Sequence, residues 1–298
     1  MRLENIGRVF LRGYHCALAG KHPAGQLEQV ELEHRGFAYE GAAMALALRD
    51  ELSFGARALP RFISGDGQRH LYMLHVGAGW AYARLPWRRR LEAVLTRFHP
   101  VLRWLIIDGY GFHQGYFHAR EQGRIAGSME PLSVDARHVF HQGLGRSLWF
   151  SRGADAQAIA RSIASLPALY GEDAWSGVGL ACAYAGGVLV ETIATLRRLA
   201  GEHAAAMAQG AAFAAKARQL ASNPAAHTET ACAVLCGMPA QAAAALCDLK
   251  FQQIDLLHSC PYQHWRKLVQ SVFSSSSLLK GHSDEYNISS PLVAAKPH

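Results

Sequence analysis

The chain is poor in charge, and lysine is scarce among its basic residues. Charged residues make up 18% of the 298 residues, and only six of the 30 basic residues are lysine. The arginines are scattered or form small clusters, whereas a nucleic-acid-binding protein more often carries a basic stripe with interleaved aromatic residues. The net charge of +7 therefore indicates a mild bias toward anionic partners, and we do not expect nucleic acid as a partner.

The sequence also lacks the apolar runs that mark targeting and membrane segments. Arg2, Arg8 and Arg12 interrupt the N-terminal apolar residues, so no signal-peptide core is expected. The nearly uncharged segment 176–193 is rich in small residues and contains a Gly-Gly pair, which favours buried helices over a membrane span. The six cysteines lack the paired spacing of a zinc site. A protein of the reducing cytoplasm without a membrane span is the expectation.

Motifs for covalent catalysis are missing as well. The sequence contains no G-x-S-x-G, no H-E-x-x-H and no P-loop. The segment IDGYGFHQGY, which follows an apolar run, is the nearest approach to a dinucleotide-binding turn. Its glycine spacing is G-x-G-x-x-x-G, and the pattern recurs where no strand is expected, so a dinucleotide site is not predicted.

What the sequence does contain is a glycine-centred segment that occurs six times. The copies are YEGAAMALAL, HVGAGWAYAR, IDGYGFHQGY, HQGLGRSLWF, WSGVGLACAY and AQGAAFAAKA, and their first glycines are Gly41, Gly77, Gly109, Gly143, Gly177 and Gly210. We call these six residues the anchor glycines. Successive anchors lie 32 to 36 residues apart, close to the period of about 34 residues in tetratricopeptide units.

Each unit is predicted to fold as two helices joined by a turn. In the unit 138–167, the glycine segment lies in the first helix, Gly153 ends that helix and Pro167 follows the second. In the unit 173–201, a Gly-Gly pair separates the two helices. We therefore predict an all-α fold, a right-handed stack of about six helix–turn–helix, tetratricopeptide-like repeats.

Fixed positions relative to the anchors have distinct chemistry. Four residues after the anchor, five of the six copies have a small residue, and this position shares a helix face with the anchor. Glycine inside a helix costs about 1 kcal/mol relative to alanine. Its repetition thus predicts close helix packing in every unit. Three residues after the anchor the side chains are mostly large and apolar, which indicates core, and Arg146 is the exception.

A polar line and several aromatic residues are the candidates for ligand binding. The position before each anchor holds Glu40, Val76, Asp108, Gln142, Ser176 and Gln209. Such a line can border the concave face where repeat proteins bind ligands, or its side chains can bond to their own helices. Aromatic residues facing the concavity would suit an apolar ligand with few polar anchors, but facing the core they would only pack. The candidate ligand-binding residues are Tyr39, Glu40, His75, Trp80, Tyr116, Gln142, Arg146 and Trp175.

Histidines offer two further hypotheses. His138 and His141 are three residues apart and His75 occupies the same repeat position as His141, so these three are the candidate metal ligands. His113 stands where other units have a small residue, and Asp108 lies in the same unit. Because broken local rules often mark functional sites, these two are the candidate catalytic residues. Buried or surface histidines and a salt-bridge network between repeats are the structural alternatives.

Five segments together resemble a known family. RGFAYEGAAMALAL, DGYGFHQGYF, HQGLGRSLWF, WSGVGLACAYAGG and AQGAAFAAKAR are similar to the enediyne-associated family of unknown function, UnbL type, over roughly residues 35–236. This resemblance implies a bacterial setting in enediyne polyketide biosynthesis, with a long conjugated polyene as ligand and polyketide-pathway proteins as partners. It implies no catalytic residues.

The predicted organisation follows from the repeats and from where they stop. Residues 1–34 form an N-terminal helical segment, 35–270 the repeat domain, and 271–298 a divergent, poorly ordered tail. The first functional hypothesis is an accessory protein that binds a polyene intermediate or partner biosynthetic proteins. The alternatives are an enzyme that modifies the polyene through a His/carboxylate site, with or without a metal, and a protein–protein scaffold without ligand.

Overall fold

The computed structural model describes residues 2–20, 23–53, 57–85, 91–119 and 121–274, which form helices and contain no strand. The long helices that carry glycine at their contacts are α1 (Arg2–Ala19), α3 (Arg35–Leu52), α5 (Leu71–Arg84), α7 (Trp104–Phe117), α9 (Val134–Ser151), α11 (Gly171–Ala185) and α13 (Ala204–Leu220). The other α-helices are α2 (Ala24–Leu27), α4 (Ala58–Ser64), α6 (Leu91–Leu95), α8 (Gln122–Met129), α10 (Ala156–Ala164), α12 (Val190–Ala200), α14 (Ala226–Cys236), α15 (Ala240–Phe251) and α16 (Pro261–Ser274). The all-helical prediction is confirmed for these residues.

The helix ends follow local sequence chemistry. Ser133 and Asp155 precede α9 and α10, and each side chain accepts a hydrogen bond from the backbone N–H three residues later. Gly186 follows α11 with φ +64°, a backbone region that L side chains rarely adopt. The boundaries predicted for the unit 138–167 therefore hold to within a few residues.

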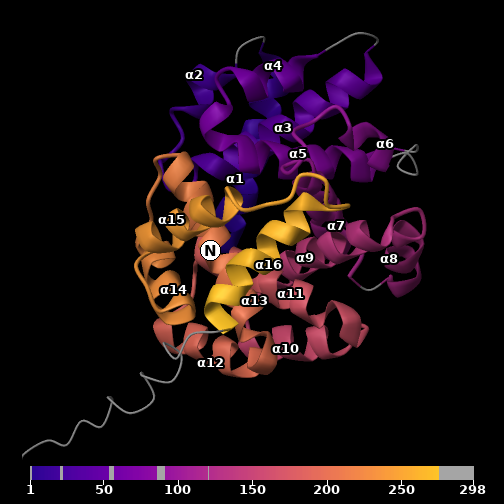
Figure 1. The fold of residues 1–298 in the computed structure, drawn as a ribbon. Coiled ribbons are helices and arrows are strands. Elements are labelled where there is room, and N and C mark those ends of the chain that lie inside the picture. Colours follow the sequence, from indigo (N-terminus) through magenta and orange to yellow (C-terminus); the bar gives the residue numbers. More distant parts are fainter. Residues whose placement is uncertain (1, 21–22, 54–56, 86–90, 120, 275–298) are drawn as a thin grey trace, which may run out of the picture.

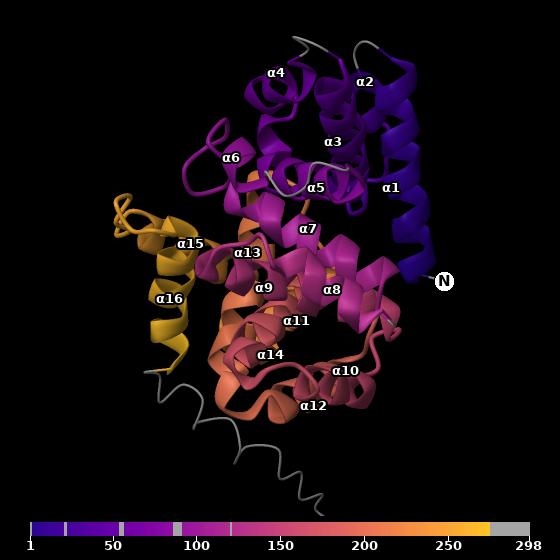
Figure 2. The same cartoon turned by 90° about the vertical axis from the view of Figure 1, so that its right-hand side faces the viewer.

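The seven long helices pack in series, α1 on α3, α3 on α5, and so on to α13. Figure 2 shows α3, α5, α7, α9 and α11 following one another from the top of the molecule downward, with α10 and α12 at the bottom. Helix α1 belongs to the series, because a Cβ at Gly13 would lie 1.9 Å from the carbonyl oxygen of Ala38 in α3. The N-terminal segment predicted as a separate unit thus packs as the first helix of the row.

The glycine pairs determine how closely these helices approach. In α7, a Cβ at Gly109 would lie 2.0 Å from the carbonyl oxygen of Val76 in α5. A Cβ at Gly111 would lie 2.1 Å from the carbonyl oxygen of Phe140 in α9. The first glycine of a pair therefore contacts the preceding long helix of the row, and the second glycine contacts the following long helix. The close contact offsets the helix-destabilising effect of glycine.

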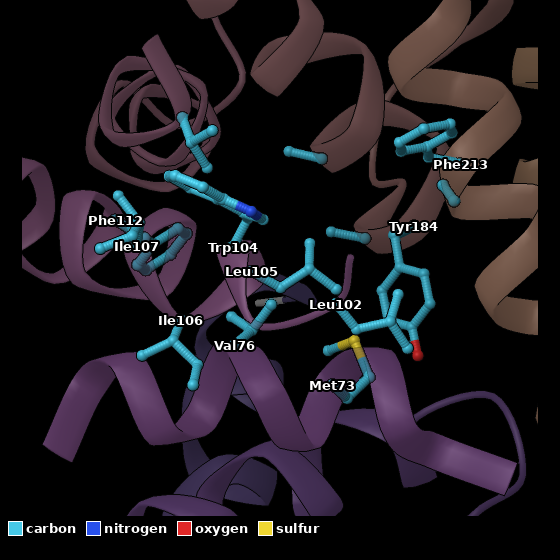
Figure 3. Packing of buried hydrophobic residues seen from close by; sticks show 14 of the residues in the cluster. Met73, Val76, Leu102, Trp104, Leu105, Ile106, Ile107, Phe112, Tyr184 and Phe213 are labelled. Atoms are coloured by element: carbon cyan, nitrogen blue, oxygen red, sulfur yellow. The ribbon is translucent and has the colours of Figure 1, made fainter. Parts of the chain in front are cut away.

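The row curves until its early and late helices meet. Phe37 of α3 packs edge-on against Tyr184 of α11, with ring centroids 5.2 Å apart. Arg2 of α1 donates from Nε to the carbonyl oxygen of Ala185, at 2.7 Å. Figure 3 shows Tyr184 in the interior beside Met73 of α5. The helices α1 and α3 at the start of the row therefore contact α11 near its end, and the row surrounds an interior space.

Helix α16 covers one side of that interior (Figure 1). Tyr262 donates its hydroxyl hydrogen to Oε1 of Gln142, at 3.1 Å, and Arg266 pairs with Asp173 at 2.8 Å. The helix continues to Ser274, so the first residues of the predicted tail are helical. The rest of that predicted tail lies outside the described residues.

No single helix in the described part of the chain combines the length and the apolar composition needed to cross a membrane. Helices α14 and α15 meet that criterion only as a pair, across a bend of 67°.

Candidate ligand-binding site

A cavity of about 240 Å³ lies between α1, α3, α5, α7, α9 and α11. Its lining residues are Leu3, Ile6, Gly7, Phe10, Leu11, Phe37, Glu40, Met73, Trp80, Phe112, Tyr116, Phe117, Arg146, Phe150, Leu180, Ala181, Tyr184 and Ala185. Six helices thus contribute to one predominantly apolar space.

Aromatic rings in mutual contact form one wall of the cavity. Trp80 is central, with ring centroids 4.7 Å from Phe10, 5.0 Å from Phe112 and 5.8 Å from Phe117. Phe150 of α9 meets Phe112 edge-on at 5.4 Å. These rings support one another and present flat apolar surfaces, which suit an apolar and preferably planar ligand.

Two charged side chains, Glu40 and Arg146, also line the cavity. Each is more than nine-tenths buried. Nη2 of Arg146 lies 2.5 Å from Oδ1 of Asp108, and its guanidinium carbon lies 4.8 Å above the Phe112 ring. The ion pair and the cation–π contact fix the guanidinium at the cavity wall.

The buried groups at the cavity are two acids, Glu40 and Asp108, and one base, Arg146. Burial raises the pKa of Glu40 to about 7; Arg146 and the Trp80 indole act to lower it, and Asp108 acts to raise it. Burial also raises the pKa of Asp108, against the opposing effect of Arg146. With Arg146 paired to Asp108, Glu40 is the additional acid, and near neutral pH it exchanges between a neutral hydrogen-bond donor and a carboxylate.

One end of the cavity opens to solvent. Leu11, Tyr116 and Phe117 line it and are exposed by 54%, 42% and 51%. Gly7 of α1 also lines it, and a Cβ there would meet nothing within 4 Å. Unlike the anchor glycines, Gly7 has no packing partner that requires glycine, so a larger side chain at this position would extend into open space at the cavity.

The opposite end borders a second, smaller cavity of about 40 Å³ beneath α16. Met73, Arg146, Leu180 and Tyr184 line both spaces and separate them. Arg146 therefore lies at the inner end of the larger cavity, away from the exposed residues at its opening.

Four of the eight predicted ligand-binding residues line the larger cavity, namely Glu40, Trp80, Tyr116 and Arg146. The other four lie elsewhere. Tyr39 donates to Oε1 of Glu28 at 2.7 Å, and Trp175 is buried in the core.

His75 and Gln142 are the remaining two. Nδ1 of His75 donates to the carbonyl oxygen of Leu71 at 2.6 Å, within its own helix. The Gln142 side chain accepts the Tyr262 hydroxyl. Both side chains therefore bind other parts of the chain.

The proposed catalytic partners Asp108 and His113 face different surroundings. His113 packs against Trp80 and Phe117, with centroids 5.7 Å and 4.7 Å away. Burial, together with Arg84, lowers its pKa to about 3. Because the two residues are five apart on one helix, they point about 140° away from each other, and the Arg146 pair includes only Asp108. His113 lies behind the aromatic wall and supports it.

The candidate metal ligands do not form a common site. His138 lies 2.6 Å from Asp173, and this hydrogen bond raises its pKa. His141 donates to the carbonyl oxygen of Arg137 at 2.7 Å and stacks on Tyr170. Throughout the part of the chain that the structure describes, no three His, Cys, Asp or Glu side chains are grouped closely enough to hold a metal ion.

Several cavity residues were not among the candidates. Phe37, Phe117 and Phe150 line the space, as do Phe10 and other residues of α1. The positions of Phe37, Phe117 and Phe150 within the repeat could have identified them. Relative to the anchors, the lining positions of α3 to α11 fall at −4, −1, +3, +4, +7 and +8, which lie on one side of a helix. The +3 position, predicted to be core, faces the cavity in α5, α7, α9 and α11.

The described residues form an all-helical fold around an apolar cavity that opens to solvent at one end. The chain matches the family described as "Protein of unknown function (DUF1702)" over residues 1–273, and it belongs to this family. The match extends from α1 into α16, so it includes all the helices that line the cavity. No match was found among curated proteins or solved structures.

Proposed function

We propose that this protein binds an elongated apolar ligand in the cavity between α1 and α11. The observation that carries the proposal is the continuous aromatic wall around Trp80, with buried Glu40 and Arg146 as the only strongly polar groups among the described lining residues. A pocket of apolar rings with few polar anchors is the usual form of a small-molecule site.

A conjugated polyene fits this chemistry. Its flat, rigid chain can stack on Trp80 and Phe112 with little loss of conformational freedom. The resemblance of the repeat segments to the enediyne-associated family suggests the same ligand class. We therefore propose a cytoplasmic accessory role in enediyne-type polyketide biosynthesis, with the polyene intermediate or pathway proteins as partners. We further propose that the helix pairs form a right-handed, tetratricopeptide-like stack of about six units.

The test is incubation of the purified protein with 1,6-diphenylhexatriene, a conjugated hydrocarbon that fluoresces in apolar surroundings. The proposal predicts saturable fluorescence at one ligand per chain and an unchanged ligand mass. Non-saturable or absent fluorescence would count against it.

The same incubation, repeated with a synthetic linear polyene, tests the enzyme alternative. Glu40 is an acid inside the cavity and is the observation that favours this alternative. A changed polyene mass that is abolished by Glu40→Gln would establish turnover. Recovery of biosynthetic proteins in a pull-down, without polyene binding, would favour the scaffold.

A further inference from the structure

The polarity of the cavity changes along its length. Exposed Leu11 and Phe117 mark the opening, whereas Arg146 borders the smaller cavity at the inner end. An amphipathic ligand would accordingly enter with its polar end toward Arg146 and leave its apolar part along the aromatic wall.

The Arg146 guanidinium has N–H donors beyond those used in its ion pair with Asp108. A guanidinium carries five N–H donors, and the ion pair with Asp108 is its only acceptor contact within the described residues. Nε has no hydrogen-bond partner there, although it is buried. Because the Arg146 side chain also lines the cavity, its guanidinium favours a ligand that carries a hydrogen-bond acceptor.

The surroundings of Glu40 indicate the same kind of ligand. The ionisable or polar groups that affect it are Arg146 from α9, Asp108 from α7, Tyr184 from α11 and the Trp80 indole from α5. In its neutral form Glu40 donates a hydrogen bond, as Arg146 does. A cationic ligand would be placed beside the guanidinium, whereas an oxyanion would meet two donors.

We propose that the cavity binds a long-chain carboxylic acid whose carboxylate docks on Arg146 and on the Glu40 carboxyl, with the chain lying along Trp80 toward the opening at Gly7. This assignment rests on the proposed function and specifies the polar end of the ligand.

The experiment compares trans-parinaric acid, a fluorescent conjugated tetraene acid, with its methyl ester. The acid is expected to bind at least about tenfold more tightly, because only the carboxylate forms charge-assisted hydrogen bonds with Arg146. Equal affinities of the acid and the ester would overturn the assignment. If the ester and diphenylhexatriene bind but the acid has no advantage, only this inference fails; if none of the three binds, the proposed function fails.

The pH dependence gives a second measurement. As the pH rises through about 7, Glu40 ionises and repels the bound carboxylate. The affinity for the acid should therefore fall by about tenfold between pH 6 and pH 8, while that for the ester stays level. Glu40→Gln retains a donor and should remove this dependence. An acid profile that is unchanged by Glu40→Gln would contradict the role given to this residue.

Removal of Arg146 alone would leave Asp108 buried without a partner, which destabilises the fold. The double variant Asp108→Asn with Arg146→Gln removes both charges together. It should lose the preference for acid over ester, and circular dichroism establishes that it is folded. Retention of that preference in the folded double variant would refute the proposal.

Discussion

Substitution of Gly143 by alanine separates intrinsic helix propensity from helix packing. Alanine in place of glycine should stabilise an isolated helix by about 1 kcal/mol. In α9, however, the new Cβ would lie 1.9 Å from the carbonyl oxygen of Asp108 in α7 and 2.8 Å from the Phe112 nitrogen. Both contacts are with backbone, so no side-chain rotation can relieve them.

The magnitude follows from the required displacement. A carbon and a carbonyl oxygen normally approach to about 3.3 Å, so α7 and α9 must separate by roughly 1.4 Å from the 1.9 Å contact. Overpacking costs about 1–3 kcal/mol, and the upper end of that range is appropriate for rigid backbone. After the propensity gain is subtracted, we expect Gly143→Ala to lower the free energy of unfolding by about 2 kcal/mol and the Tm by about 4 °C.

The assay is chemical and thermal denaturation followed by circular dichroism, with Gly127→Ala as the control. Gly127 also lies in a helix, α8, but a Cβ there would meet nothing within 4 Å, so this variant should gain about 0.5–1 kcal/mol. If both variants gained stability alike, the glycine positions would not be packing sites and the reasoning would be refuted.

Three further predictions concern other contacts. The hydrogen bond to Asp173 raises the pKa of His138. Its contribution to stability is therefore present at low pH and is lost as the pH rises through the raised pKa. In denaturation experiments, His138→Gln should lower the free energy of unfolding more at pH 5.5 than at pH 8. All six cysteines are buried, and burial raises the pKa of Cys182, so Ellman's reagent should react slowly with the native protein and rapidly with all six thiols after unfolding. Arg218 donates to the Glu33 carbonyl at 3.2 Å and connects α13 with the chain before α3; Arg218→Met should destabilise the protein by about 3 kcal/mol and speed hydrogen exchange in α3.

The sequence was sufficient for much of the architecture. The recurrence of the anchor glycines predicted close helix packing in every unit, and Gly109 and Gly143 occupy such close contacts. This succeeds because a glycine inside a helix is costly, so its regular recurrence has a local physical cause. Helix was predicted within residues 1–34, but the place of α1 in the row was not, because only Gly13 marks the contact there, without a full copy of the segment.

The candidate site was predictable only in part. The polar line before the anchors led to Glu40, and the exception in an apolar column led to Arg146. The catalytic role predicted for His113 stays a prediction, and the structure shows its ring packed against Trp80 and Phe117. Repeat positions do not reveal how far the row of helices curves, so the meeting of Phe37 with Tyr184, which encloses the cavity, could not be predicted.

The most direct test of the central claim is the affinity of diphenylhexatriene for Gly7→Leu. This substitution places a side chain in open space at the cavity lining without disturbing a helix contact. Gly127→Leu in α8, outside the lining, is the matched control. Saturable binding is expected for the wild type and for Gly127→Leu, and affinity at least about tenfold weaker is expected for Gly7→Leu. Equal binding by all three proteins would contradict ligand binding in this cavity.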